Sequence, residues 1–82
     1  MLLLKLEGRL TGPWVEELNR LWNESLAVQG KQQITIDLRE TTFADTAGIR
    51  LLRAIYAQSG AVILSGTPWT QYLAEEVQRR DA

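Results

Sequence analysis

The stretch Phe43-Ala44-Asp45-Thr46-Ala47-Gly48-Ile49 joins a short strand-like run to an amphipathic helix-like run. Its acid, hydroxyl and glycine contribute little to packing, so their place between two core elements needs a reason. Asp and Thr are preferred helix N-caps, because their oxygens accept hydrogen bonds from the unpaired amides of the first turn. A hydroxyl at a helix start also suits a protein-docking or phosphoacceptor site, since a phosphate there meets free amides and the positive end of the helix dipole. Capping is the first interpretation and the docking site the second, and the two are compatible.

The segments on either side of this stretch have the periods of a strand and of a helix. Residues 33–38 alternate isoleucine and leucine with polar residues, which is typical of a strand. Residues 39–42 are polar and are expected to form a loop that Phe43 and Ala44 close. From Ala47, apolar side chains recur at helical spacing and predict a helix that ends near Ser59-Gly60. Its apolar positions are Leu51, Leu52, Ile55 and Tyr56.

The N-terminal part predicts a strand followed by the longest helix. Leucines at positions 2, 4 and 6 alternate with Leu3, Lys5 and Glu7, so residues 2–7 predict a strand with one buried face that ends at Gly8. Pro13 suits the first turn of a helix, because its missing amide would be unpaired there, and Thr11 or Gly12 would be the cap. The helix carries one apolar stripe and stops at a C-cap glycine. These positions are Val15, Leu18, Leu21, Trp22, Leu26, Val28 and Gly30.

The C-terminal part predicts a last strand and a third helix. The run Ala-Val-Ile-Leu at residues 61–64 is continuously apolar, which favours a buried strand over an edge strand. Thr67 and Pro68 give a cap followed by proline at the first helical position. The helix that follows has its apolar positions at Trp69, Tyr72, Leu73 and Val77, and the tail is expected to fray at Asp81-Ala82.

The order strand, helix, strand, helix, strand, helix predicts an α/β fold with a mostly parallel sheet and right-handed crossovers. Because three strands are few, Arg9-Leu10 is expected to extend the first strand or turn back on it. Loops that follow the carboxyl ends of parallel strands are the usual functional edge. The loops at Thr11-Gly12, Asp45-Thr46 and residues 65–67 are therefore candidates to converge on one rim.

Composition excludes several classes of function. The chain has 82 residues, 45% of them hydrophobic and 23% charged, which suits one small globular domain over residues 1–82. Its net charge is −1 and Arg79-Arg80 is only a pair, so we expect no nucleic-acid partner. The apolar run at residues 1–4 is too short for a signal peptide or a membrane span, which favours a cytoplasmic protein without membrane insertion.

The residue types also argue against an enzyme. The chain contains no cysteine and no histidine, which removes thiol catalysis, zinc–thiolate sites, the commonest general base and the commonest metal ligand. Asp37 is expected to tie down the loop after its strand rather than to pair with Asp45 in catalysis. Residues 60–66 lack the Lys-Ser/Thr of a phosphate-binding loop, and Ser59 and Ser65 have no histidine to activate them. We therefore expect no catalytic residue, no metal and no cofactor.

Two motifs together resemble the STAS domain, the family named for sulphate transporters and anti-sigma factor antagonists. The first motif is Ile34-Thr35-Ile36-Asp37-Leu38, which resembles the family's strand ending in Asp-Leu. A short loop follows, and then residues 43–52, which resemble the family's Asp-Ser-Ser/Thr-Gly helix start. The second is Leu6-Glu7-Gly8-Arg9-Leu10, which is similar to the family's Gly-x-Leu/Ile before the first helix. The resemblance covers about residues 4–77 and implies a small mixed sheet with helices packed on it.

The resemblance also implies a function. Family members that antagonise anti-sigma factors carry a phosphorylated serine where this chain has Thr46, and the added charge abolishes docking to an anti-sigma factor with serine kinase character. The first expectation is thus a docking module in a regulatory partner switch, with Thr46 as phosphoacceptor candidate. The alternative is an accessory subunit of a phospholipid-transport ABC system, in which the same loop contacts the ATPase. The residues expected to bind the partner are Thr11, Asp45, Thr46, Ala47, Gly48 and Arg50.

Two further expectations concern the surface. Trp22 lies on the apolar stripe and is expected in the core. Trp14 and Trp69 each follow a proline at a helix start; we expect them to close the ends of a thin core, and the alternative is that they are exposed interface anchors. The N-terminal strand can lie at a sheet edge and pair there with the same strand of a second copy, which leaves a weak homodimer as an open alternative.

Overall fold

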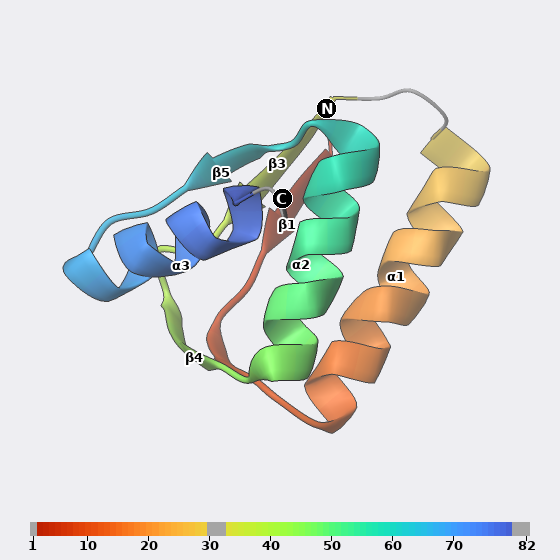
Figure 1. The fold of residues 1–82 in the computed structure, drawn as a ribbon. Coiled ribbons are helices and arrows are strands. Elements are labelled where there is room, and N and C mark those ends of the chain that lie inside the picture. The colour runs from red at the N-terminus through yellow and green to blue at the C-terminus, as the bar shows by residue number, and fades with distance from the viewer. Residues whose placement is uncertain (1, 30–32, 80–82) are drawn as a thin grey trace.

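The computed structural model describes residues 2–29 and 33–79 and confirms the α/β class, with three helices packed on parallel strands (Figure 1). The order of elements is β1 (Leu2–Lys5), β2 (Gly8–Leu10), α1 (Pro13–Gln29), β3 (Ile34–Asp37), β4 (Thr41–Ala44), α2 (Thr46–Ser59), β5 (Val62–Leu64) and α3 (Pro68–Gln78). The side chains of Leu26 and Val28, the predicted cap at Gly30 and the tail at Asp81-Ala82 lie outside the described part.

The strands form two small sheets, one in the order β1-β3-β5 and one of β2 and β4. Every pairing within the described residues is parallel. The expected loop closure at Phe43 and Ala44 is wrong, because both residues belong to β4. Of the two alternatives for Arg9-Leu10, the structure shows the extension and not the turn back: the segment forms β2 and pairs with β4, with Arg9 opposite Phe43. Segments this short pair only because the strands before them already lie side by side.

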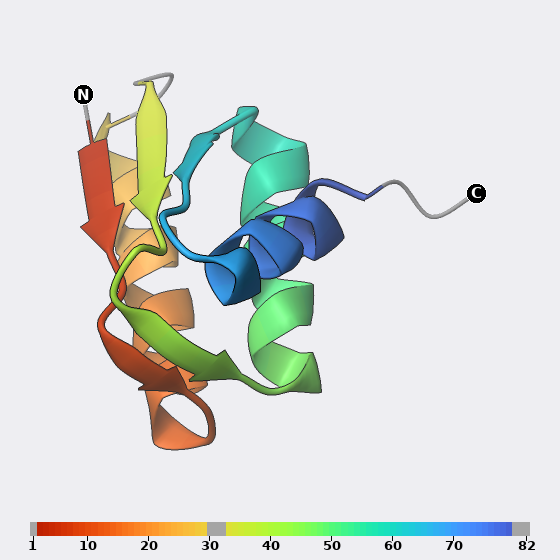
Figure 2. The same ribbon diagram turned by 90° about the vertical axis from the view of Figure 1, so that its left-hand side faces the viewer.

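The two sheets are successive halves of one bent ribbon. Between the halves, the Leu6 amide donates to the Asp37 carbonyl at 3.0 Å and the Gly8 amide donates to the Glu40 carbonyl at 3.0 Å. The bend falls at Gly8, which has a φ of 76° that glycine adopts without strain, and the register shifts between Gly8 and Arg9. The bend carries the ends of β2 and β4 beyond the three-stranded sheet, and these ends lead into α1 and α2 (Figure 2).

The central strand β3 is buried along its whole length, and β5 lies at an edge. The expectation of a buried strand at residues 61–64 is therefore wrong. Only Ala61, which precedes β5, is buried there, whereas Val62 is 45% exposed. The reason is the strand order: β5 has β3 on one side, and no described strand follows it on the other. An apolar run cannot distinguish a central strand from an edge strand whose one face packs on helices.

The helices bury the core against one side of the strands. Figure 2 places α2 and α3 on one side of the three-stranded sheet, and Figure 1 shows α1 beside α2, on the side of β1. The alternation predicted for residues 2–7 is confirmed, because Leu2, Leu4 and Leu6 pack against the core. Side chains from β3 to α3 are fully buried, among them Ile36, Leu38, Leu52, Ile55, Leu73 and Val77. No helix in the described residues is both long and apolar enough to cross a membrane.

The three tryptophans differ in burial. Trp22 is in the core, as expected, and its indole Nε1 donates to Gln58 Oε1 at 3.3 Å. Trp69 is half-buried against the core and stacks on Tyr72, with ring centroids 6.0 Å apart. Trp14 is 65% exposed, so the expectation that it closes the core is wrong for this residue. It projects from the first turn of α1, where the strands opposite leave an open groove.

Candidate functional site

Asp45 connects β4 to α2 and caps the helix, as the sequence predicts. Its backbone is extended, with φ −84° and ψ 178°, and its Oδ1 accepts a hydrogen bond from the Gly48 amide at 2.7 Å. The Asp45 carbonyl accepts the Ile49 amide at 2.9 Å, and the Asp45 amide donates to the Leu10 carbonyl at 3.2 Å. One residue therefore fixes the start of α2 and its distance from the end of β2.

Gly48 is needed because the start of α2 lies close against β2. A Cβ added at Gly48 would lie 2.8 Å from the Leu10 carbonyl oxygen and 3.1 Å from Leu10 Cγ. The oxygen belongs to the backbone of a paired strand and cannot move aside cheaply. Gly48 is itself buried, so its part in the site is to allow this close approach rather than to touch a partner.

The residues around this cap face solvent. Thr46 is the first residue of α2, and Thr46, Ala47 and Arg50 are all exposed, whereas Asp45 is half-buried. Within the described residues the Thr46 hydroxyl makes no hydrogen bond and Arg50 makes no ion pair. Thr46 and Arg50 are one helical turn apart and so lie on the same face of α2. A hydroxyl and a guanidinium are thus displayed together at a helix N-terminus.

Thr11 lies beside this helix start. β2 and β4 end together, with Leu10 opposite Ala44, so Thr11 and Asp45 occupy neighbouring strand ends. The Thr11 carbonyl accepts the Trp14 amide at 3.0 Å, which begins α1. The structure therefore brings together the residues predicted for partner binding, on the loop that enters α1, at the cap of α2 and in the first turns of α2.

The third predicted loop, residues 65–67, does not join this rim. It follows β5 in the other sheet, and Gly66 lies against the Arg39 side chain. Figures 1 and 2 both show the start of α3 apart from the starts of α1 and α2. Parallel strands end at a common edge only within one sheet, and the bend at Gly8 separates the two edges.

Sequence reasoning missed Phe43 and Arg9, which lie next to the site. Phe43 is 42% exposed, and the guanidinium carbon of Arg9 stands 5.1 Å from the centroid of its ring. The two residues are paired across β2 and β4. A cation over an aromatic face is mildly attractive and holds the ring in place. The one signal in the sequence was the β-propensity of Thr41-Thr42-Phe43, which would have suggested a strand there.

Asp37 ties down the loop after β3, as expected. Its Oδ1 accepts the Arg39 amide and Arg39 Nε, each at 3.0 Å, and its Oδ2 accepts Arg39 Nη2 at 3.0 Å. These hydrogen bonds favour the charged carboxylate and lower the pKa of Asp37 to about 2. Asp37 and Asp45 are thus each engaged locally. Within the described residues no three acidic side chains gather where they would hold a metal ion.

No family model matches the chain, and a search of curated proteins finds no match. The resemblance to the STAS family therefore stays a prediction, carried by the motifs quoted above.

Proposed function

We propose that this chain is a small, non-catalytic docking module of the STAS type, working in the cytoplasm and binding a protein partner through the β4–α2 junction. The observation that carries this proposal is Thr46, an exposed threonine at the first position of α2 whose hydroxyl the fold does not use. Phe43 on β4, the strand that leads into this junction, is exposed and offers an aromatic contact of the kind that interfaces favour.

The site suits a charge switch. A phosphate on Thr46 would add negative charge at the positive end of the α2 dipole, next to Arg50, so the helix would tolerate it. The same charge would disturb a partner packed on Ala47 and would repel an acidic partner surface. Phosphorylation at Thr46 would thus change binding without unfolding the domain, which is what a partner switch requires.

Docking is tested with two exposed alanines of the same helix. Ala47→Trp places a large side chain on the proposed surface, whereas Ala57→Trp places it near the far end of α2. Partners captured from the native host are identified by mass spectrometry. We expect Ala47→Trp to lose a partner that wild type and Ala57→Trp retain, with equal melting temperatures for both variants. Retention by Ala47→Trp would contradict docking at this junction.

The switch is tested separately, with Thr46→Glu and with Gln71→Glu as an exposed control on α3. An anti-sigma or serine-kinase-like partner lost only in Thr46→Glu, with phosphate mapped to Thr46, supports the partner switch. Equal capture by both forms contradicts it. An ABC ATPase captured by both, without phosphate on Thr46, assigns the protein instead to the accessory subunits of phospholipid transport.

A further inference from the structure

β1 presents an open backbone edge. It pairs with β3 on one side, and no described strand lies on its other side. The Leu2 amide donates to the Gln33 carbonyl at 2.9 Å and the Leu6 amide donates to the Asp37 carbonyl at 3.0 Å, so the even-numbered residues point their backbone groups toward β3. Leu3 and Lys5 therefore point their amides and carbonyls outward. Such a row of donors and acceptors is a template for another strand.

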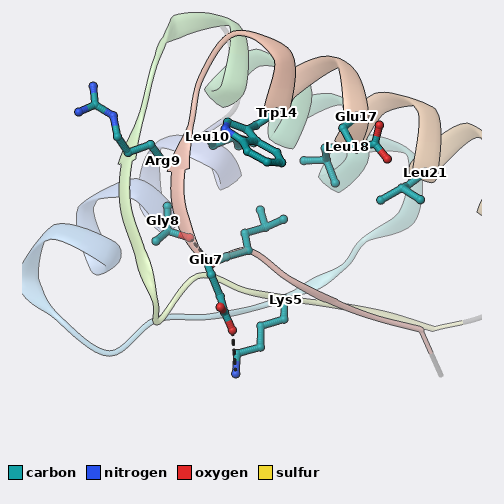
Figure 3. Close-up of a pocket in the computed structure, with 11 residues that line it drawn as sticks. Lys5, Glu7, Gly8, Arg9, Leu10, Trp14, Glu17, Leu18 and Leu21 are labelled. Carbon is teal, nitrogen blue, oxygen red and sulfur yellow. Dashed lines mark hydrogen bonds and ion pairs between the residues drawn. The ribbon is translucent and has the colours of Figure 1, made fainter.

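An apolar groove begins where this edge ends, at Lys5. A cavity of about 190 Å³ lies between the β1–β2 segment and α1. Figure 3 shows Trp14, Leu18 and Leu21 projecting from α1 toward this segment. The Arg9 side chain, which belongs to the segment, points away from these three residues. Leu21 is 43% exposed, so the groove is incompletely covered. At its rim Lys5 and Glu7 form an ion pair with 3.4 Å between Nζ and Oε1.

β1 itself has the sequence that fits such an edge. Its leucines at positions 2, 4 and 6 face the helix side, and Leu3, on the opposite side, is 51% exposed. Antiparallel pairing of two β1 strands about Leu4 would place Leu3 opposite Lys5 of the second copy, exchanging their outward backbone hydrogen bonds. Leu4 would meet Leu4 of the second copy, with Leu2 opposite Leu6. No like charges would be opposed.

We propose that β1 is a self-association edge, at which a second copy of this chain adds its own β1 antiparallel about Leu4 and places its Leu2 opposite Leu6, which lines the groove. This contact and docking at the β4–α2 junction use different parts of the surface.

A disulfide between single cysteines tests the edge and its register. The chain has no native cysteine, so each variant carries one thiol. Residues in a non-hydrogen-bonded antiparallel pair have Cα atoms about 4.5 Å apart, which a disulfide can bridge. Leu4→Cys should form a covalent dimer on mild oxidation, and Val62→Cys on the other edge strand should stay monomeric. A dimer of Val62→Cys, or none from Leu4→Cys, would overturn the proposal.

Charge at position 3 tests the same register without a covalent bond. Leu3→Glu would face Lys5 of the second copy, whereas Leu3→Lys would oppose two like charges. Sedimentation equilibrium over a concentration series should give a dimer constant about tenfold tighter for Leu3→Glu than for Leu3→Lys, since each of two symmetric pairs contributes. Circular dichroism of each monomer verifies the fold. Equal constants, or a wild type that stays monomeric throughout, would overturn the proposal.

Discussion

The starts of α2 and α3 are both capped, but they use their threonines differently. At α3, Thr67 Oγ1 accepts the Thr70 amide at 3.1 Å, and the buried Thr70 hydroxyl accepts the amides of Gly66 and Thr67 at 2.9 and 2.8 Å. At α2 the cap is Asp45, and the Thr46 hydroxyl faces solvent without a hydrogen bond in the described residues. Both threonines of the α3 start are thus part of the structure, whereas the one at the α2 start is available for function.

The glycines at the two starts should give the largest contrast. Gly48→Val should lower the free energy of unfolding by about 3 kcal/mol, because its side chain would meet the Leu10 backbone. A Cβ at Gly66 would lie 3.2 Å from Arg39 Cγ, a contact that a shift of a few tenths of an ångström relieves, so Gly66→Ala should cost less than about 1 kcal/mol. Urea denaturation measures both. A neutral Gly48→Val would mean that α2 does not approach β2 this closely.

The threonines give the next contrast, with the same substitution at both starts. Thr70→Val should cost about 2 kcal/mol, because the amides of Gly66 and Thr67 both lose the Thr70 hydroxyl as their acceptor. Thr46→Val should stay within about 0.5 kcal/mol of wild type, because the exposed hydroxyl makes no hydrogen bond with the described residues. Thermal unfolding of the matched pair checks this. Equal costs would show that Thr46 is structural after all, which would remove the main support for a docking role.

The Asp45 side chain should make a smaller contribution to stability as the cap of α2. Asp45→Ala should lower stability by about 1 kcal/mol, while Asp45→Asn should be nearly neutral because asparagine caps as well as aspartate. Amide hydrogen exchange at Gly48 should lose protection in the alanine variant, since that amide donates to Asp45. Unchanged exchange at Gly48 would contradict the cap.

Local signals predicted the parts of the fold that depend on neighbouring residues. The caps at Asp45 and Thr67, the end of α2 at Gly60 and the loop tie at Asp37 each involve hydrogen bonds over a few residues. Pairing of β2 with β4 depends on a ribbon built from segments far apart in the sequence, and three or four residues carry too weak a pattern to predict it.

The same limit applied to the surface. The order of strands, and not the composition of residues 61–64, decides that β5 is an edge. The exposure of Trp14 depends on a groove that exists only once α1 has packed. For the site, the sequence placed Thr11 and Asp45 on neighbouring loops and Thr46 at a helix start, but it omitted Phe43, because a strand was taken for a loop.

Acid should weaken the tie between Asp37 and Arg39 beside the α3 start, and this is the smallest expected effect. Asp37 holds Arg39, and Arg39 lies against Gly66. The pKa of Asp37 is lowered from 3.8 to about 2 in the folded chain, chiefly by side-chain hydrogen bonds from Arg39, so the unfolded chain binds this proton first as the pH falls. The contribution of Asp37 to stability is therefore complete above pH 3.8 and is lost as the pH falls through about 2.

Asp37→Asn removes this titration, so the stability difference between wild type and Asp37→Asn should shrink across that window. A difference that stays constant with pH would show that Arg39 does not hold the Asp37 carboxylate.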